Sequence, residues 1–244
     1  MNSVSNEEII WNFLFNKIHN SFGVAGLMGN LFAESGLDPE NLQNSGNKKL
    51  SMSDQEYTKA VDSGKYNNFV KDSQGYGLAQ WTYWTRKQEL FSYAKNQKVS
   101  IGNLRMQLEF LCKEFEEKYK GVFNTLQKAT SVKQASNCVL HEFERPANQS
   151  ILVENKRYEY SMVYYQKFAN KNIAEFSSVP YKIRSKRSIP IKQHTWNDSK
   201  TITILEPGVY TIIKYKKGRD NNVGWGKLKS ELGWISLDLV EIIS

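Results

Sequence analysis

The sequence has few cysteines and no long apolar run. Its 244 residues include two cysteines, Cys112 and Cys138, without the cysteine and histidine spacing of a zinc site. Because both lie in helical patterns among apolar residues, we expect two reduced, buried thiols. A chain of this length buries enough apolar surface to fold without disulfides or metal. No apolar run approaches the ~20 residues that a membrane-spanning helix requires, so membrane insertion is excluded.

A signal peptide is also missing. Residues 1–8 contain no basic segment followed by an apolar stretch, so we expect no signal peptide. The alternative is a mature form whose leader has been removed. A thiol peptidase is disfavoured as well, although Cys138 and His141 are three residues apart. A nucleophilic cysteine needs an exposed, electropositive setting such as a helix N-terminus. Cys138 falls in the middle of a predicted helix.

Positive charge is in excess over the whole sequence, but it is unevenly distributed along the chain. The formal net charge is +8. Residues 1–170 carry 20 basic and 18 acidic side chains, a net of +2. Residues 171–244 carry 13 and 7, a net of +6. The last third of the chain is therefore expected to attract anions in a salt-dependent way.

Helical patterns dominate residues 1–170. Ser5 with Glu8, and Ser53 with Glu56, have the spacing of capping boxes, and Gly36 suits a helix C-terminus. Residues 65–82 are rich in Gly, Asn, Ser and Tyr and predict a loop or small hairpin. Apolar residues spaced at i, i+3, i+4 and i+7 predict helices near 5–18, 24–35, 53–64, 84–95, 104–119, 132–143 and 155–168.

The pattern changes near residue 170. Residues 171–180 read as a polar linker, and short β-branched runs follow, separated by turn signals such as Pro207-Gly208, Lys217-Gly218 and Leu232-Gly233. Such runs predict a small all-β barrel or sandwich. The predicted strands are 181–184, 201–205, 209–215, 224–229 and 233–236. We therefore expect a multidomain protein, with an α-rich domain over 1–170, the linker, and a β domain over 181–244.

Glu34 is the first candidate for chemistry. The apolar positions Val24, Leu27 and Leu31 continue to position 34, which places this carboxyl group on the core-facing side of the last helical turn. Burial and the negative end of the helix dipole both favour the protonated form of a carboxyl group there. A protonated carboxyl group is what general-acid cleavage of a glycosidic bond requires. The alternative is a glutamate that is solvated at a helix end.

A second segment, residues 75–82, combines glycines with aromatic side chains. Gly75 and Gly77 permit tight turns and close approach of the backbone to a ligand. Aromatic rings with polar ends suit the faces of sugars, and Gln80 supplies a donor and an acceptor. The alternative is a hairpin that only packs on the helices. The candidate substrate-binding residues are Tyr76, Gln80, Trp81 and Thr82.

Together, the two segments resemble the signature motifs of the lysozyme superfamily. Goose-type lysozymes and lytic transglycosylases follow a helix-end Glu-Ser with a strand similar to residues 77–80. The phage tail lysozyme family is resembled more closely, through residues 26–30, 33–36 and 72–82 and the run Phe143-Glu144-Arg145-Pro146. This resemblance covers about residues 5–168. It implies an α+β lysozyme-like fold and a hydrolase of peptidoglycan glycan strands, with Glu34 as the acid and no metal or cofactor.

The second carboxylate of such a site is not where better-known lysozymes have it. Hen-type enzymes have an Asp where this chain has Gly75, and goose-type enzymes have a carboxylate after the Gln, where Trp81 stands here. Asp72 is the nearest candidate, ahead of Asp54 and Asp62. If Asp72 activates water, the two carboxyl groups should lie about 6.5–9.5 Å apart, against about 5–5.5 Å for a nucleophile. The alternative is a transglycosylase with no second carboxylate.

The run around Glu144 allows two interpretations. We favour a structural ion pair or a helix-end hydrogen bond for Glu144 and Arg145. The alternative is that they line the substrate cleft.

The C-terminal β segment resembles the bacterial SH3-like domains attached to cell-wall hydrolases, through residues 224–229 and 233–238. The resemblance implies wall anchoring, with Trp225 and Trp234 as candidate wall-binding residues, although either could be a core residue. The net charge of +6 agrees with binding to teichoic acid phosphates. A small basic β barrel with aromatic side chains could instead bind single-stranded nucleic acid. We disfavour that partner, because the wall-hydrolase resemblance accounts for both segments.

The sequence thus predicts a phage-type endolysin that cuts the β-1,4 bond between N-acetylmuramic acid and N-acetylglucosamine. The expected partners are peptidoglycan and anionic wall polymers, not nucleic acid or a membrane. We expect synthesis in the host cytoplasm, followed by holin-dependent release or delivery in a virion. A lytic transglycosylase giving 1,6-anhydro ends and an inactive wall-binding tail protein are the alternatives.

Overall fold

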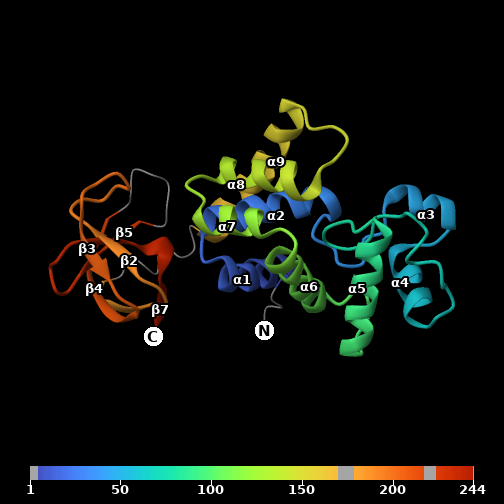
Figure 1. Ribbon diagram of the computed structural model, residues 1–244, viewed down its shortest axis with the longest axis horizontal. Helices are drawn as coiled ribbons and strands as arrows, with labels where there is room; N and C mark the ends of the chain where they lie inside the picture. The colour runs from blue at the N-terminus through green and yellow to red at the C-terminus, as the bar shows by residue number, and fades with distance from the viewer. Residues whose placement is uncertain (1–4, 170–178, 217–223, 244) are drawn as a thin grey trace.

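The structure, a computed structural model, describes residues 5–169, 179–216 and 224–243 (Figure 1). Helices form the first of these ranges and antiparallel strands form the other two. The predicted fold class is therefore confirmed. The helical elements are α1 (Asn6–Ile18), α2 (Ser21–Ser35), α3 (Asn44–Leu50), α4 (Asp54–Asp62), α5 (Trp84–Gln97), α6 (Leu104–Glu117), α7 (Lys120–Lys128), α8 (Val132–Cys138), the π-helix η1 (Val139–Glu144), α9 (Ile151–Tyr164) and the π-helix η2 (Tyr165–Ala169).

Local capping signals fix several helix ends. Ser5 caps α1 by accepting a hydrogen bond from the Glu8 amide, and Ser53 forms a complete capping box with Glu56 at α4. Gly36 ends α2 in the left-handed region, with φ of 64°, where a residue without Cβ has no steric penalty. These predicted boundaries are confirmed.

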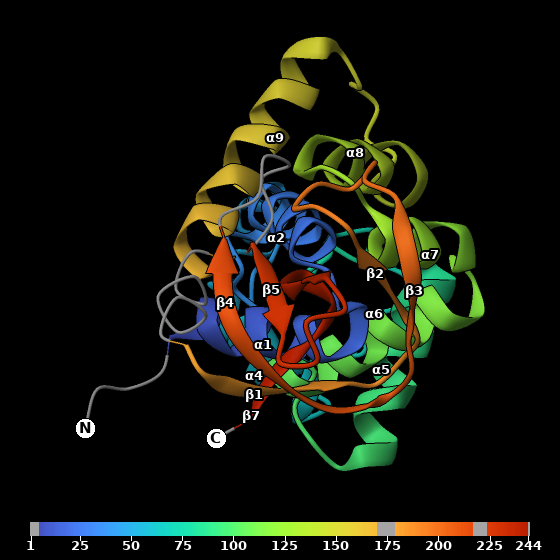
Figure 2. The same cartoon turned by 90° about the vertical axis from the view of Figure 1, so that its left-hand side faces the viewer.

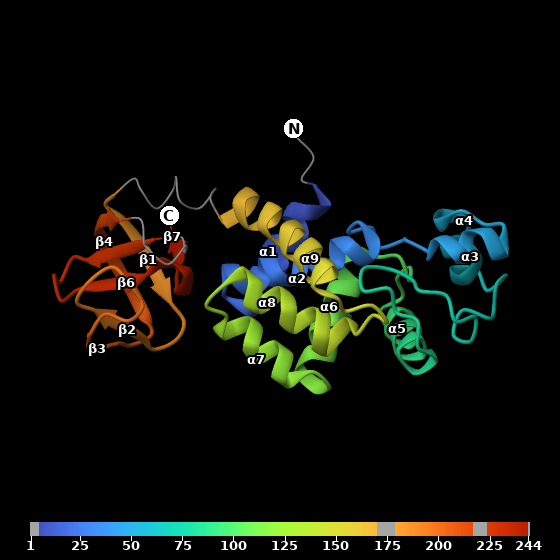
Figure 3. The ribbon, with the colours of Figure 1, turned by 90° about the horizontal axis from the view of Figure 1, so that it is seen from above.

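Helix α2 lies at the centre of the helical part, beside α1, α8 and α9 (Figures 1 and 3). All its residues from 21 to 31 are buried. Glycines allow its neighbours to approach closely: a Cβ added at Gly29 would lie 2.1 Å from the Ser161 hydroxyl oxygen of α9. The structure therefore holds the C-terminal end of α2, which carries Glu34, against α9.

A second group of elements, α3 to α5 with the loops between them, lies beyond the end of α2 (Figure 1). Its core includes Tyr57, Phe69 and Tyr76. Residues 65–82, predicted as a loop or small hairpin, form a loop in which a bridge joins Tyr76 to Trp81. The sequence predicted neither α3 nor α7, which are short helices of 7 and 9 residues.

The β part has a core of its own. Its strands are β1 (Tyr181–Ser185), β2 (Ile189–Lys192), β3 (Thr201–Leu205), β4 (Gly208–Lys216), β5 (Trp225–Leu228), β6 (Trp234–Ser236) and β7 (Glu241–Ile243), with a 3-10 turn, η3 (Leu237–Leu239), before the last. They form one antiparallel sheet in the order β3-β2-β6-β5-β4-β1-β7, which curls around buried residues such as Ile183, Ile212 and Ile235 (Figure 2).

Five of these strands match predicted ones, while β2 and β7 were not predicted. Pro190 lies within β2, and proline removes a backbone donor and weakens a strand signal. Residues 171–178 of the predicted linker and the predicted turn at Lys217-Gly218 lie outside the described residues.

Both cysteines are buried and free, as expected. Burial raises the pKa of the Cys112 thiol to about 12 and also raises that of Cys138, so neither thiol is poised as a nucleophile. Within the described residues, no helix is both long and apolar enough to cross a membrane.

Candidate active site

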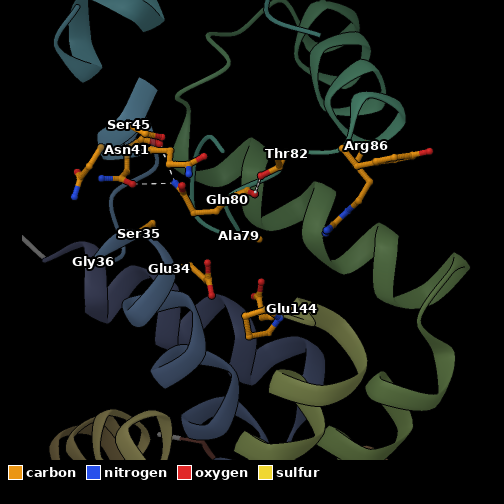
Figure 4. A pocket seen from close by; sticks show the side chains of 14 residues that line it. Glu34, Ser35, Gly36, Asn41, Ser45, Ala79, Gln80, Thr82, Arg86 and Glu144 are labelled. Atoms are coloured by element: carbon orange, nitrogen blue, oxygen red, sulfur yellow. Dashed lines mark hydrogen bonds between the residues drawn. The ribbon is translucent and has the colours of Figure 1, made fainter. Parts of the chain in front are cut away.

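A cleft of about 840 Å³ opens where the end of α2 faces α3 and the start of α5. Polar side chains dominate its lining, and Figure 4 shows them projecting from several elements. Its residues are Glu34, Ser35, Gly36, Asn41, Gln43, Asn44, Ser45, Ala79, Gln80, Thr82, Tyr83, Arg86, Glu144 and Pro146. A polar groove of this size suits a hydrophilic, chain-like substrate better than a small apolar ligand.

Glu34 lies on the last turn of α2 and reaches this cleft. Its Oε1 atom accepts a charge-assisted hydrogen bond from Arg157 of α9, whose other terminal nitrogen donates to the Asn30 carbonyl at 2.8 Å. The Glu34 side chain is 20% exposed. The expected placement at a helix end is therefore found, but the carboxylate is paired with a guanidinium group rather than packed among apolar groups alone.

The segment 75–82 forms the opposite edge of the cleft. The Ser35 hydroxyl donates to the Leu78 carbonyl at 2.9 Å, which ties this segment to the end of α2. The Gln80 amide donates to Asn41 Oδ1 at 2.8 Å, and an added Cβ at Gly75 would lie 2.6 Å from Gln80 Oε1. A larger residue at position 75 would therefore require the end of the Gln80 side chain to shift. The close approach of this backbone to a ligand stays a prediction.

The four candidate substrate-binding residues divide into two pairs. Gln80 and Thr82 line the cleft. Tyr76 and Trp81 are fully buried in the core, where the Tyr76 hydroxyl bonds to Thr58 and the Trp81 indole donates to Glu114. Their position supports the alternative of a packed hairpin. Tyr83 is the aromatic residue that lines the cleft, and it is 65% exposed.

Asp72 does not line the cleft. It is buried in the α3–α5 region, where its Oδ1 atom pairs with Lys87 of α5 at 2.5 Å. Its Oδ2 atom accepts hydrogen bonds from the hydroxyls of Tyr57 and Tyr66. Burial lowers the pKa of Lys87, and the contact with Asp72 opposes that effect. The structure thus places Asp72 in a closed ion pair that orders this region, and not beside Glu34.

The two weaker carboxylate candidates also lie outside the cleft lining. Asp54 accepts a hydrogen bond from the Asn47 side chain at 2.8 Å, and Asp62 accepts one from the Ile101 amide at 3.0 Å. Asp54 thus accepts from a side chain of α3, and Asp62 accepts from the backbone before α6, so both carboxylates have structural partners. The carboxylate expected from the region between residues 54 and 72 is not found in the cleft.

Glu144 supplies the second carboxyl group of the cleft. It is the last residue of the π-helix η1, and Figure 4 shows its carboxyl group facing that of Glu34. Its Oε1 atom is buried and has no hydrogen-bond partner in the described structure. Burial, followed by the adjacent Glu34 carboxylate, raises the pKa of Glu144 to about 8. The interpretation of Glu144 as a structural ion pair is therefore not supported, and its alternative, a cleft position, is found.

Arg86 completes the charged groups of the cleft. Its guanidinium forms a bidentate pair with the buried Glu114 of α6, at 2.7 and 2.8 Å. Its planar group also lies 5.0 Å from the ring centroid of Phe143. Sequence reasoning missed both Arg86 and Arg157. Neither arginine lies in a motif, and Arg157 is 123 positions from its partner.

The comparison with protein-family models agrees with this geometry. The model described as phage tail lysozyme matches residues 5–168. The chain belongs to the phage tail lysozyme family. That match covers about two thirds of the sequence and the whole cleft, and it indicates a lysozyme-like, peptidoglycan-lytic function at the bacterial cell wall. No curated protein matches the chain.

The family match ends before the β part. Of the two tryptophans proposed to bind the wall, Trp225 is buried in the sheet, and Trp234 is partly exposed on β6. Only the second has a side chain that a polymer can reach. The SH3-like identity of the sheet stays a prediction.

Proposed function

We propose that this phage tail lysozyme family member is a glycoside hydrolase that cleaves the β-1,4 bond between N-acetylmuramic acid and N-acetylglucosamine in peptidoglycan. The observation that supports this most directly is the pair Glu34 and Glu144, two carboxyl groups that face each other in a polar cleft. A carboxyl pair flanking the scissile bond is the usual requirement for glycoside hydrolysis.

Glu34 is the proposed general acid. It gives a proton to the departing sugar oxygen, and water then attacks the anomeric carbon. Gln80 and Thr82 lie where hydroxyl and acetamido groups of the sugars would be held. Ser35 and Asn41 fix the two edges of the cleft through their contacts with Leu78 and Gln80.

The β part is the proposed wall-binding domain, joined to the lytic domain by residues 171–180. Its net charge of +6 over residues 171–244 supports attraction to anionic wall polymers. Basic side chains such as Lys182 and Arg184 are exposed on β1. This assignment includes no role for nucleic acid.

Fragment analysis tests the proposed reaction. Purified peptidoglycan is digested with the full chain, and the reduced fragments are identified by mass spectrometry. Reduced muramic acid ends are the expected result. Reduced glucosamine ends would assign a glucosaminidase, anhydromuramic ends a lytic transglycosylase, and new amino groups without new reducing ends a peptidase. Each of the last three results contradicts the proposal, as does the absence of all fragments, which would leave a binding protein.

A further inference from the structure

The charges behind the cleft do not balance unless one proton is held among them. Three carboxyl groups, from Glu34, Glu114 and Glu144, lie close to two guanidinium groups, from Arg86 and Arg157. These are the charged groups that face Glu144 from α2, α5, α6 and α9. If all were ionised, the cluster would carry one uncompensated negative charge, and such a charge is costly where water is excluded.

The hydrogen bonds indicate which carboxyl group lacks compensation. Arg157 is committed to Glu34 and to the Asn30 carbonyl. Arg86 is committed to Glu114, which also accepts a hydrogen bond from the Trp81 indole. In the described structure, the Oε1 atom of Glu144 has no partner.

We propose that Glu144 stays protonated at neutral pH and forms with Glu34 a carboxyl pair that supplies the proton for glycosidic cleavage. Two carboxyl groups at close range do not both ionise readily, so such a pair retains one proton over a wide pH range. Glu144 acts through Glu34: it is a proton-holding partner in the reaction assigned above, and the inference rests on that proposed function.

The proton balance of this step is complete. The glycosidic oxygen takes one proton from the pair, and the bond from the anomeric carbon to that oxygen breaks, its electrons passing to the oxygen. Water adds to the anomeric carbon and returns one proton to the pair. The pair thus regains its starting state, and Arg157 remains in contact with Glu34 throughout.

The pH dependence of cleavage by Glu144→Gln tests the proposal. For the unmodified chain, kcat/KM should fall above about pH 8, where burial and Glu34 set the pKa of Glu144. Because glutamine cannot hold a proton for Glu34, the fall in kcat/KM with rising pH should begin at a lower pH in the variant than in the unmodified chain. We expect a loss of about 100-fold at pH 7.5 and little change near pH 5.

Glu142→Gln is the matched control, because this exposed glutamate lies on the same π-helix, two residues away. It should keep the original pH profile. A Glu144→Gln profile with its basic limb unchanged would overturn the proposal, whatever the absolute rate. An equal loss of kcat/KM at all pH values would also overturn the proposal, because a structural defect lowers activity without moving the basic limb of the pH profile.

Carboxyl ¹³C NMR of the full chain gives a readout that does not depend on cleavage. One glutamate should titrate near pH 8, its signal should vanish in Glu144→Gln, and its midpoint should move to lower pH in Glu34→Gln. If the chain cleaves peptidoglycan but no glutamate titrates near pH 8, the proposed carboxyl pair is overturned and the proposed function stands. Titration without cleavage of any peptidoglycan overturns the proposed function, and with it the role of the stored proton.

Discussion

At the scale of single residues, partners decide what each carboxyl group can do. Asp72 and Glu114 are buried, and Glu144 is partly exposed with a buried Oε1 atom, but the three carboxyl groups differ in their cations. Asp72 has Lys87 and Glu114 has Arg86, whereas Glu144 has no partner at its buried Oε1 atom. The paired groups order the protein, and the unpaired one is available to the reaction.

Asp72→Asn separates these roles. The substitution leaves the Lys87 ammonium buried without its counter-charge, and breaking a buried ion pair in this way typically costs about 3 kcal/mol. We expect a lower midpoint in urea unfolding and a cleavage rate per folded molecule close to that of the unmodified chain. Loss of cleavage at unchanged stability would instead make Asp72 part of the reaction.

At the scale of elements, local signals predicted the longer helices, but not the short α3 and α7 or the way the helices assemble the cleft. Ser53 and Gly36 mark helix ends through contacts within a few residues, so the sequence alone shows them. The pair of Glu34 and Arg157 joins α2 to α9 across 123 positions, and no local pattern encodes it. Likewise Trp81 lies in a recognisable motif, but its burial depends on α6, which supplies Glu114.

The spacing between α2 and α9 is the element-scale feature that holds Arg157 beside Glu34. Gly29→Ala would place a methyl group 2.1 Å from the Ser161 hydroxyl oxygen and 2.4 Å from its backbone nitrogen. The helices must then separate, at a cost of about 1–3 kcal/mol, and Arg157 moves with α9. We expect lower stability in urea unfolding together with slower cleavage.

Gly121→Ala is the control for that substitution. Gly121 lies in α7, and an added Cβ would meet no atom within 4 Å. Alanine is the better helix former, so this variant should gain up to about 1 kcal/mol. If Gly29→Ala had the same stability and cleavage rate as Gly121→Ala, the close packing of α2 on α9 would not be needed to position Arg157 beside Glu34.

At the scale of the whole molecule, the cleft and the sheet lie at different places along the long axis. Figures 1 and 3 show the β part at one end and α3 to α5 at the other. The helical and β parts have separate cores. A polymer bound by the sheet would therefore leave the cleft open to the glycan strand.

Salt dependence of wall binding checks the role of the β part. Removal of residues 171–244 should weaken co-sedimentation with purified cell walls at about 50 mM salt. The full chain should lose most of the same binding near 1 M salt, where the screening length falls to about 3 Å. Equal binding with and without these residues would exclude an anchoring role for the sheet.

The most direct measurement of the central claim is the rate at which Glu34→Gln releases reducing ends from purified peptidoglycan, compared with the unmodified chain and with Glu142→Gln. Removal of a general acid typically lowers the rate about 10²- to 10⁴-fold. We expect a loss in that range for Glu34→Gln, at unchanged folding by circular dichroism, and an unchanged rate for Glu142→Gln. Full activity in folded Glu34→Gln would contradict the assignment of this cleft as the lytic site.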